Sequence, residues 1–521
     1  MCGFLVTAQE HPIPEGVVAT LSSRGPDEND VKNYLGYNFH HWRLALVGGK
    51  SGRQPIQTVE GLVVFNGEIY NWREVAVSFF PEACDLIEGD TQLLLKILSS
   101  KRYRALDHID GIFSFVFIGC DGKFLYGRDH LGIKPLFFTF DSKNKIAFAS
   151  NAKCLGKLFS KAKQPTLEVM MNALGTVPAP LTQFEDVSRA PCGEVFEYDP
   201  TKQTTRSVFK ICTTKVIALP ESKRAFINDF RDEVYSTVRS QWQPEVSSVP
   251  LSGGLDSGVL AYVLKDLPDC NFVSLASRPD DPDQLIATKR ARLASRDIVS
   301  SIVSRRDVNL EQFFSDFDLP TVDGLNSYLL AKAVNEGATK VLISGIGPDE
   351  YLNGYSQPRV RAKRDVRELE VLTSKRLRII KEVYPLTLQF ILMRGTAESL
   401  RKLSVDNLEV IERSMETSRS ITAIDGENSF YLSNQLIPDA DHFTMVNGVE
   451  LRVPFLSLRL IPYYMAASSY NLADNKQLLR EAFASEVVDS LPVKRGFSIQ
   501  SRDFFSDRQS LSLATCEASL V

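Results

Sequence analysis

The sequence of 521 residues has no long hydrophobic run, no paired cysteine spacing and no large excess of one charge. Its longest apolar stretch, 112–120, is far too short to cross a bilayer, and the N-terminus lacks the charged and then apolar pattern of a signal peptide. The eight cysteines show no CxxC spacing, so all but Cys2 are interpreted as small buried residues in a reducing compartment. We therefore expect a cytoplasmic protein that does not enter a membrane.

A net charge of −4 gives no concentrated basic surface, which argues against binding to nucleic acid. The run 289–306 is rich in basic residues, but its acids and apolar residues favour a solvated helix face. No cluster with metal-ligand spacing is visible. The length exceeds what one hydrophobic core supports and predicts two or three domains, with the composition of a soluble globular protein.

The stretch Val249-Pro-Leu-Ser-Gly-Gly-Leu-Asp-Ser257 predicts a strand, 247–251, followed by a glycine turn and a helix. Glycine lets the backbone turn sharply and approach a ligand, and the free N–H groups of a helix N-terminus stabilise an anion. Ser252 and Ser257 add hydroxyl donors, and Asp256 adds a carboxylate that suits Mg²⁺ held against phosphates. An ordinary strand-to-helix turn is the alternative.

A second glycine turn, Ser344-Gly-Ile-Gly-Pro-Asp-Glu350, follows a predicted strand over 340–344. Strands alternate with helices in this half of the chain, and another strand is expected over 272–276, which is the pattern of a doubly wound parallel sheet. Ligands of such sheets bind at the carboxyl ends of the strands. Both turns therefore point to one crevice, where Asp256 and Asp349 are candidate ligands of Mg²⁺ on a triphosphate.

Cys2 is either an ordinary small residue or a nucleophile. Removal of Met1 would give it a free α-amine, whose pKa of about 7.7–8.0 suits a general base for its own thiol. Candidate partners are Arg43 on an alternating strand, the polar strand end Asn66-Gly67-Glu68, and Asp90, which is placed as the N-cap of a helix. Each of these has an ordinary structural interpretation when it is taken alone.

Taken together, these segments resemble a class II, N-terminal nucleophile glutamine amidotransferase domain of the kind fused to asparagine synthetase. The motifs that carry the resemblance are Met1-Cys-Gly3, Arg24-Gly-Pro-Asp27, Phe65-Asn-Gly-Glu-Ile-Tyr-Asn71, Gly89-Asp-Thr91 and Gly127-Arg-Asp-His-Leu-Gly-Ile-Lys-Pro-Leu136. The resemblance implies an α+β fold of four layers, α/β/β/α. It also implies that Cys2 attacks the side-chain amide of glutamine and releases ammonia. The implied partners are Asn66 and the Gly67 N–H for the oxyanion, Arg43 for the α-carboxylate of glutamine, and Glu68 and Asp90 for its α-ammonium. His130 has no role and is interpreted as structural.

The glycine turns resemble the ATP pyrophosphatase-type synthetase domain of asparagine synthetases. Further matches are Leu319-Pro-Thr-Val-Asp-Gly-Leu-Asn326, Val449-Glu-Leu-Arg-Val-Pro-Phe455, Asn475-Lys-Gln-Leu-Leu-Arg480 and Pro492-Val-Lys-Arg-Gly-Phe497. The resemblance implies that a carboxylate is adenylated by ATP with release of pyrophosphate, and that ammonia then attacks the acyl-AMP. Lys476 falls on the lysine that meets the acyl-adenylate, with Lys494 and Arg495 as further basic candidates. Implied ATP contacts are Leu251, Ser252, Gly253, Gly254, Asp256, Ser257, Leu275, Ser344 and Gly345.

The expected organisation is an amidotransferase domain over 2–200, a linker over 201–225 and a synthetase domain over 226–521. The expected substrates are glutamine, ATP with Mg²⁺, and aspartate as the default acceptor, with no permanent organic cofactor; a homodimer is an open alternative to a monomer. Ile346 stands where the family has an acid, so another carboxylate, such as a biosynthetic intermediate or a sugar acid, is the alternative acceptor. A non-catalytic protein that binds a nucleotide or a partner is the second alternative. The region 357–435 resembles nothing assignable.

Overall fold

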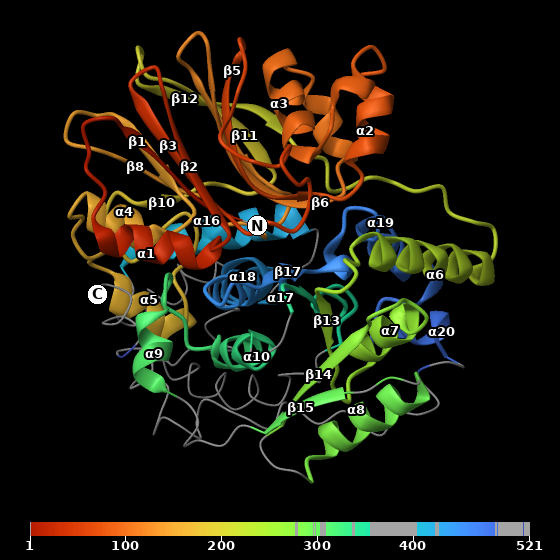
Figure 1. The fold of residues 1–521 in the computed structure, drawn as a ribbon. Helices are drawn as coiled ribbons and strands as arrows, with labels where there is room; N and C mark the ends of the chain where they lie inside the picture. Colours follow the sequence, from red (N-terminus) through yellow and green to blue (C-terminus); the bar gives the residue numbers. More distant parts are fainter. Residues whose placement is uncertain are drawn as a thin grey trace.

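The computed structural model describes residues 2–276, 280–294, 296, 298–302, 309–335, 339–354, 404–422, 427–484, 487 and 514. The first domain is built on two six-stranded antiparallel sheets (Figure 1). One has the order β10 (Ser188–Arg189), β8 (Phe137–Phe140), β9 (Ile146–Ala149), β1 (Cys2–Ala8), β3 (Tyr37–Arg43), β2 (Glu28–Tyr34). The other has the order β12 (Thr204–Lys210), β11 (Glu194–Asp199), β7 (Phe124–Arg128), β6 (Gly111–Gly119), β5 (Gly61–Ile69), β4 (Ile56–Gln57).

The alternation of side chains along each strand builds the layers. In β6, Phe113, Phe115 and Phe117 pack with the helices α2 (Trp72–Phe79) and α3 (Asp90–Ser100), whereas Val116 and Ile118 face the other sheet. The first sheet is covered in the same way by α1 (Glu15–Arg24) and α4 (Ala152–Leu158). The predicted α/β/β/α arrangement is therefore confirmed.

The second domain is built on a parallel sheet with the order β15 (Ile298–Ile302), β14 (Asn271–Ala276), β13 (Ser247–Pro250), β16 (Val341–Ile343), β17 (Glu450–Arg452). From β13 the chain proceeds to β14 and β15 on one side, and then crosses to β16 and β17 on the other. The strand order thus reverses between β13 and β16. The carboxyl ends of these two strands are the place where a doubly wound sheet binds its ligand, so the predicted class of this domain is confirmed.

Helices surround this sheet, and β17 and α18 lie beside the first domain (Figure 1). The described helices of the second half are α6 (Lys223–Ser240), α7 (Leu255–Leu264), α8 (Pro282–Leu293), α9 (Leu310–Ser315), α10 (Leu325–Asn335), α11 (Pro348–Tyr351), α16 (Val405–Thr422), α17 (Glu427–Tyr431), α18 (Ile437–Met445), α19 (Ile461–Ala466) and α20 (Gln477–Ala482). The helix α5 (Leu167–Leu174) belongs to the first half of the chain. Within the described ranges, no helix combines the length and hydrophobicity that crossing a membrane would require.

Three local expectations differ from the structure. The stretch 201–225, predicted as a linker, contains β12, which pairs with β11, so the second sheet of the first domain extends past the predicted boundary at 200. Asp90 is the first residue inside α3 and Gly89 is the N-cap. The basic run 289–306 is not one solvated helix, because α8 ends at 293, β15 follows, and Arg290 is buried. Most of the unassigned region 357–435 lies outside the described residues.

Candidate active sites in the two domains

Cys2 and Asn66 meet at the edge of the space between the two sheets of the first domain. Cys2 continues the face of β1 that carries Phe4 and Val6, and Asn66 continues the face of β5 that carries Val64. The backbone N–H of Cys2 donates to Asn66 Oδ1 at 3.0 Å. Asn66 Nδ2 is buried and has no hydrogen-bond partner among the described residues. A buried donor without a partner is costly, and here it lies beside the candidate nucleophile.

Gly67 has a backbone conformation that requires glycine. Its φ is +152°, and a Cβ atom there would lie 2.1 Å from the carbonyl oxygen of Ile112 on the neighbouring strand. Any side chain would separate β5 from β6 at the residue that follows Asn66. The glycine therefore keeps the Asn66 side chain and the backbone of Gly67 in place.

The environment of the Cys2 thiol favours the thiolate. Burial raises the pKa of the thiol, but His41 beside it lowers the pKa through its charge and a hydrogen bond, and the net result is a pKa of about 7. His41 Nε2 lies 3.2 Å from the carbonyl oxygen of Phe65. The sequence analysis assigned no role to His41. The sequence feature that could have indicated a role is the position of His41 two residues before Arg43, which places both side chains on the same face of the strand.

Arg43 lies opposite Cys2 in the pairing of β1 with β3. It donates from Nη1 to Glu28 Oε2 and from Nη2 to the carbonyl oxygen of Val47, both at 2.7 Å. Gly52 packs against the guanidinium so closely that a Cβ atom there would lie 2.6 Å from Nη2. The fork of Arg43 is therefore held in one orientation near the thiol, as binding of a carboxylate requires.

Glu68 forms an ion pair with Arg452 of the second domain, where the sequence analysis predicted a contact with the ammonium of glutamine. Arg452 is buried and also donates to Glu450 Oε1 at 2.6 Å. Burial raises the pKa of Glu68 and Arg452 opposes this, while the nearby carboxylates of Glu450 and Asp90 raise it further. The carbonyl oxygen of Arg452 accepts from the Ser344 N–H at 2.8 Å. One residue therefore connects the Cys2 site with the second glycine turn.

Asp90 lies near Glu68, and its carboxylate accepts the backbone N–H groups of Thr91 at 2.7 Å and Ile69 at 3.3 Å. Burial raises the pKa of Asp90. The contact of Asp90 with the ammonium of glutamine stays a prediction.

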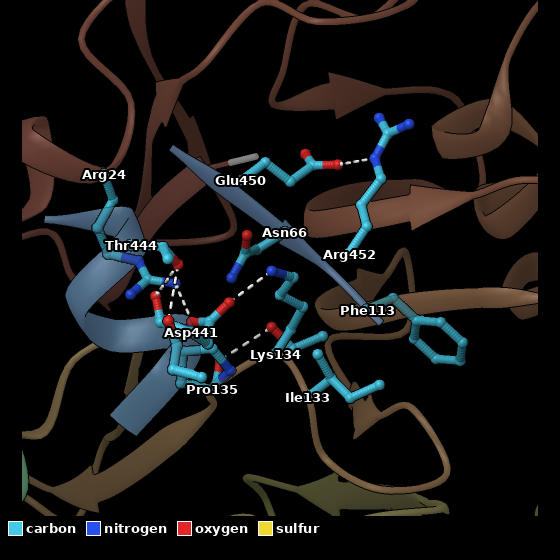
Figure 2. Close-up of polar contacts among 12 residues, drawn as sticks. Arg24, Asn66, Phe113, Ile133, Lys134, Pro135, Asp441, Thr444, Glu450 and Arg452 are labelled. Carbon is cyan, nitrogen blue, oxygen red and sulfur yellow. Dashed lines mark hydrogen bonds and ion pairs between the residues drawn. The ribbon is translucent and has the colours of Figure 1, made fainter. Parts of the chain in front are cut away.

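Further buried contacts join the two domains. Arg24 Nη2 and Lys134 Nζ donate to the two carboxylate oxygens of Asp441, at 2.9 and 2.5 Å (Figure 2). His130 Nε2 lies 2.8 Å from the carbonyl oxygen of Leu456. The predicted structural interpretation of His130 is consistent with this contact. These buried ion pairs stabilise the contact between the two domains, because removal of one partner would leave a buried charge unpaired.

In the second domain, the serines of the first glycine turn stabilise the turn itself. Ser257 Oγ lies 2.9 Å from Ser252 Oγ and accepts the Ser252 N–H at 3.1 Å, while Ser252 Oγ accepts the Gly254 N–H at 3.1 Å. The second turn packs directly against this one, because a Cβ atom on Gly345 would lie 3.1 Å from Asp256 Cβ. The two predicted turns are therefore in direct contact.

Lys476 joins the two candidate metal ligands. Its Nζ lies 2.6 Å from Asp256 Oδ2 and 2.6 Å from Asp349 Oδ1. Burial alone would lower the pKa of Lys476, and the two carboxylates outweigh burial and raise it. Gly354 makes room for the lysine, since a Cβ atom there would lie 2.1 Å from Lys476 Cε. Two carboxylates that converge on one ammonium group also have the oxygen donors that a divalent metal takes.

The other residues singled out from the sequence are Leu275, Ile346, Lys494 and Arg495. Leu275 is the second-to-last residue of β14 and packs with Phe313 and Leu329. Ile346 is partly buried against the core of the second domain, so it offers an apolar side chain beside the second turn. Lys494 and Arg495 lie outside the described residues. The sequence analysis missed the role of Gly354, because it belongs to no recognisable motif.

The fold and the two sites define a two-domain ligase with an amidotransferase domain. The Glutamine amidotransferase domain family matches residues 1–209, and the Asparagine synthase family matches residues 229–514. The chain therefore belongs to the asparagine synthase family. It is similar to "Asparagine synthetase [glutamine-hydrolyzing] 1" of Bacillus subtilis, with 26% identity over 88% of this chain and 79% of that protein. It is also similar to the corresponding synthetase of Cricetulus griseus, with 27% identity over 94% of this chain and 80% of that protein.

A solved structure of the glutamine phosphoribosylpyrophosphate amidotransferase of B. subtilis, complexed with ADP and GMP, covers 66% of this chain and 81% of that chain. The identity is 12% and the TM-score is 0.28.

Proposed function

We propose that the protein is a glutamine-dependent amide synthetase, in which Cys2 releases ammonia from glutamine and the second domain joins that ammonia to an adenylated carboxylate. The observation that carries the proposal is the buried Asn66 Nδ2, a hydrogen-bond donor without a described partner beside Cys2. Such a donor is what an oxyanion intermediate needs. The acceptor proposed by default is aspartate.

In the first half-reaction, the Cys2 thiolate attacks the side-chain carbonyl carbon of glutamine. Asn66 Nδ2 and the Gly67 N–H stabilise the oxyanion, and Arg43 orients the substrate through its α-carboxylate. Removal of Met1 makes the nitrogen of Cys2 an α-amine, and this amine passes a proton to the departing ammonia. Water then hydrolyses the thioester to glutamate.

In the second half-reaction, a carboxylate oxygen attacks the α-phosphorus of ATP and pyrophosphate leaves. Asp256 and Asp349 would hold Mg²⁺, which would supply positive charge for the phosphates. Lys476 adds a cation for the charge that develops on the phosphoryl group. Ammonia then attacks the acyl carbon and AMP leaves, which yields the amide.

The two half-reactions need a protected path for ammonia, because free ammonia becomes protonated in bulk water. Glu68 is two residues from Asn66 and pairs with Arg452, whose carbonyl oxygen holds the Ser344 N–H. This short connection supports direct transfer between the sites.

Ile346 favours a second candidate, in which the same two half-reactions serve a different carboxylate. An isoleucine side chain neither binds the ammonium of aspartate nor moves a proton. Formation of AMP from ATP, measured against a panel of carboxylic acids that includes aspartate, separates the two candidates. Formation of AMP in the presence of aspartate supports the default acceptor. If aspartate gives no AMP and another acid does, aspartate is rejected as the acceptor.

The pH dependence of glutamine hydrolysis tests the assignment of the thiolate. Because the pKa of Cys2 is about 7, we expect kcat/KM for glutamine to rise as the pH increases through about 7 and to level off above it. His41→Gln removes the largest of the contributions that lower this pKa, so the midpoint should move to a higher pH. The measurement is the release of glutamate across the pH range.

His40→Gln is the matched control, since His40 is adjacent on β3 but stacks on Trp42, away from Cys2. Its profile should match that of the wild type. An unchanged midpoint in His41→Gln would assign the titration to another group.

A further inference from the structure

Arg290 is a buried cation that lies against the first glycine turn. It belongs to α8 and only 7% of its surface is exposed. Its Nη1 donates to the carbonyl oxygen of Ser252 at 3.1 Å and to that of Gly254 at 2.5 Å. Gly258 of α7 accommodates the guanidinium, because a Cβ atom there would lie 2.9 Å from Arg290 Cζ. Arg290 therefore fixes two peptide units of the turn.

Arg290 retains donors that the described part of the chain does not satisfy. Its Nε and Nη2 atoms are buried and have no hydrogen-bond partner there. Burial lowers the pKa of Arg290 to about 10, although the charges of Asp256 and Asp283 raise it, so the side chain is still protonated at neutral pH. A buried cation with unused donors costs free energy unless it serves a ligand or a fixed conformation.

The direction of the two carbonyl groups determines what the turn presents on its other side. In a planar trans peptide, the C=O and the following N–H point in opposite directions. The carbonyl groups of Ser252 and Gly254 point to Arg290, so the N–H groups of Gly253 and Leu255 point away from it. Those N–H groups lie at the start of α7, where an anion is stabilised.

We propose that Arg290 is a positioning residue for the pyrophosphate end of the nucleoside triphosphate. It orients the N–H groups of the turn toward the phosphates, and its charge offsets the carboxylates of Asp256 and Asp283. The inference rests on the proposed function, because it assigns pyrophosphate to the turn.

Binding of Mg-pyrophosphate and of AMP to the full chain, measured by titration calorimetry, tests this inference. We expect Arg290→Met to weaken pyrophosphate binding about tenfold or more, the effect of losing a charge-assisted contact, and to leave AMP binding within about twofold. Arg290→Lys keeps the charge and should recover part of the affinity. Glutamine hydrolysis at the distant Cys2 site should be unchanged, which shows that each variant is folded.

Arg292→Met is the matched control, because Arg292 is an exposed arginine on the same helix. It should bind both ligands as the wild type does. Pyrophosphate binding that is unchanged in Arg290→Met would overturn the inference, and so would an equal loss of pyrophosphate and AMP. The binding test is independent of the acceptor: a wild type that binds pyrophosphate but forms AMP with no acid contradicts the proposed function alone.

Discussion

Cys2→Ala is expected to abolish glutamine hydrolysis, with a loss of at least ~10⁴-fold in kcat, which is the scale seen when a covalent nucleophile is removed. The reason is that no other described thiol lies beside Asn66. The second domain keeps its own site, so formation of AMP should persist when ammonium is supplied in place of glutamine. Glutamate and AMP, measured in the same reaction mixture, report on the two sites separately.

Cys120→Ala is the matched control for this experiment, because Cys120 is an exposed cysteine elsewhere in the same domain. It should hydrolyse glutamine at the wild-type rate. If Cys2→Ala hydrolysed glutamine at an unchanged rate, the amidotransferase assignment would be wrong. The intact mass of the purified protein should be measured in the same experiment, since the proposed general base requires that Met1 has been removed.

Lys476→Met should lower the rate of pyrophosphate release at least ~10²–10³-fold, which is the usual effect of removing a group that stabilises transition-state charge. The lysine is the cation that Asp256 and Asp349 share. Its removal leaves the buried carboxylate of Asp256 and the partly buried carboxylate of Asp349 facing each other, and breaking a buried ion pair costs about 3–5 kcal/mol of stability. Hydrolysis of glutamine should continue, because Cys2 lies in the other domain.

Lys476→Arg separates loss of chemistry from loss of folding. It keeps a cation between the two carboxylates, so it should lose less stability than Lys476→Met does. The guanidinium is larger than the ammonium that packs against Gly354, so the rate of pyrophosphate release should stay low. Lys223→Met is the surface control, since its ion pair with Glu481 is largely exposed. Pyrophosphate release at the wild-type rate in Lys476→Met would remove the lysine from the mechanism.

The sequence predicted the features that depend on local pattern. The strand and helix around Ser252, the second turn at Gly345 and the polar end of β5 at Asn66 are each encoded in a few adjacent residues. The convergence of the two turns followed from a general property of doubly wound sheets. Periodicity and turn chemistry are sufficient for such features.

The contacts between distant parts of the chain were not predictable from pattern alone. Glu68 and Arg452 are 384 residues apart, and a carboxylate that resembles a substrate ligand in one domain pairs with an arginine of the other. Arg290 was assigned to a solvated face because the charge pattern does not show which side of α8 packs on the sheet. The end of the first domain was placed too early because β12 is mostly exposed and polar, as an edge strand often is.

The most direct test of the central claim is the stoichiometry of the complete reaction. The purified protein is incubated with glutamine, Mg-ATP and an acceptor acid, and glutamate, pyrophosphate, AMP, ADP and amide are measured together. The account predicts one pyrophosphate and one AMP for each amide formed, with glutamate released as glutamine is consumed. ADP as the nucleotide product would contradict it.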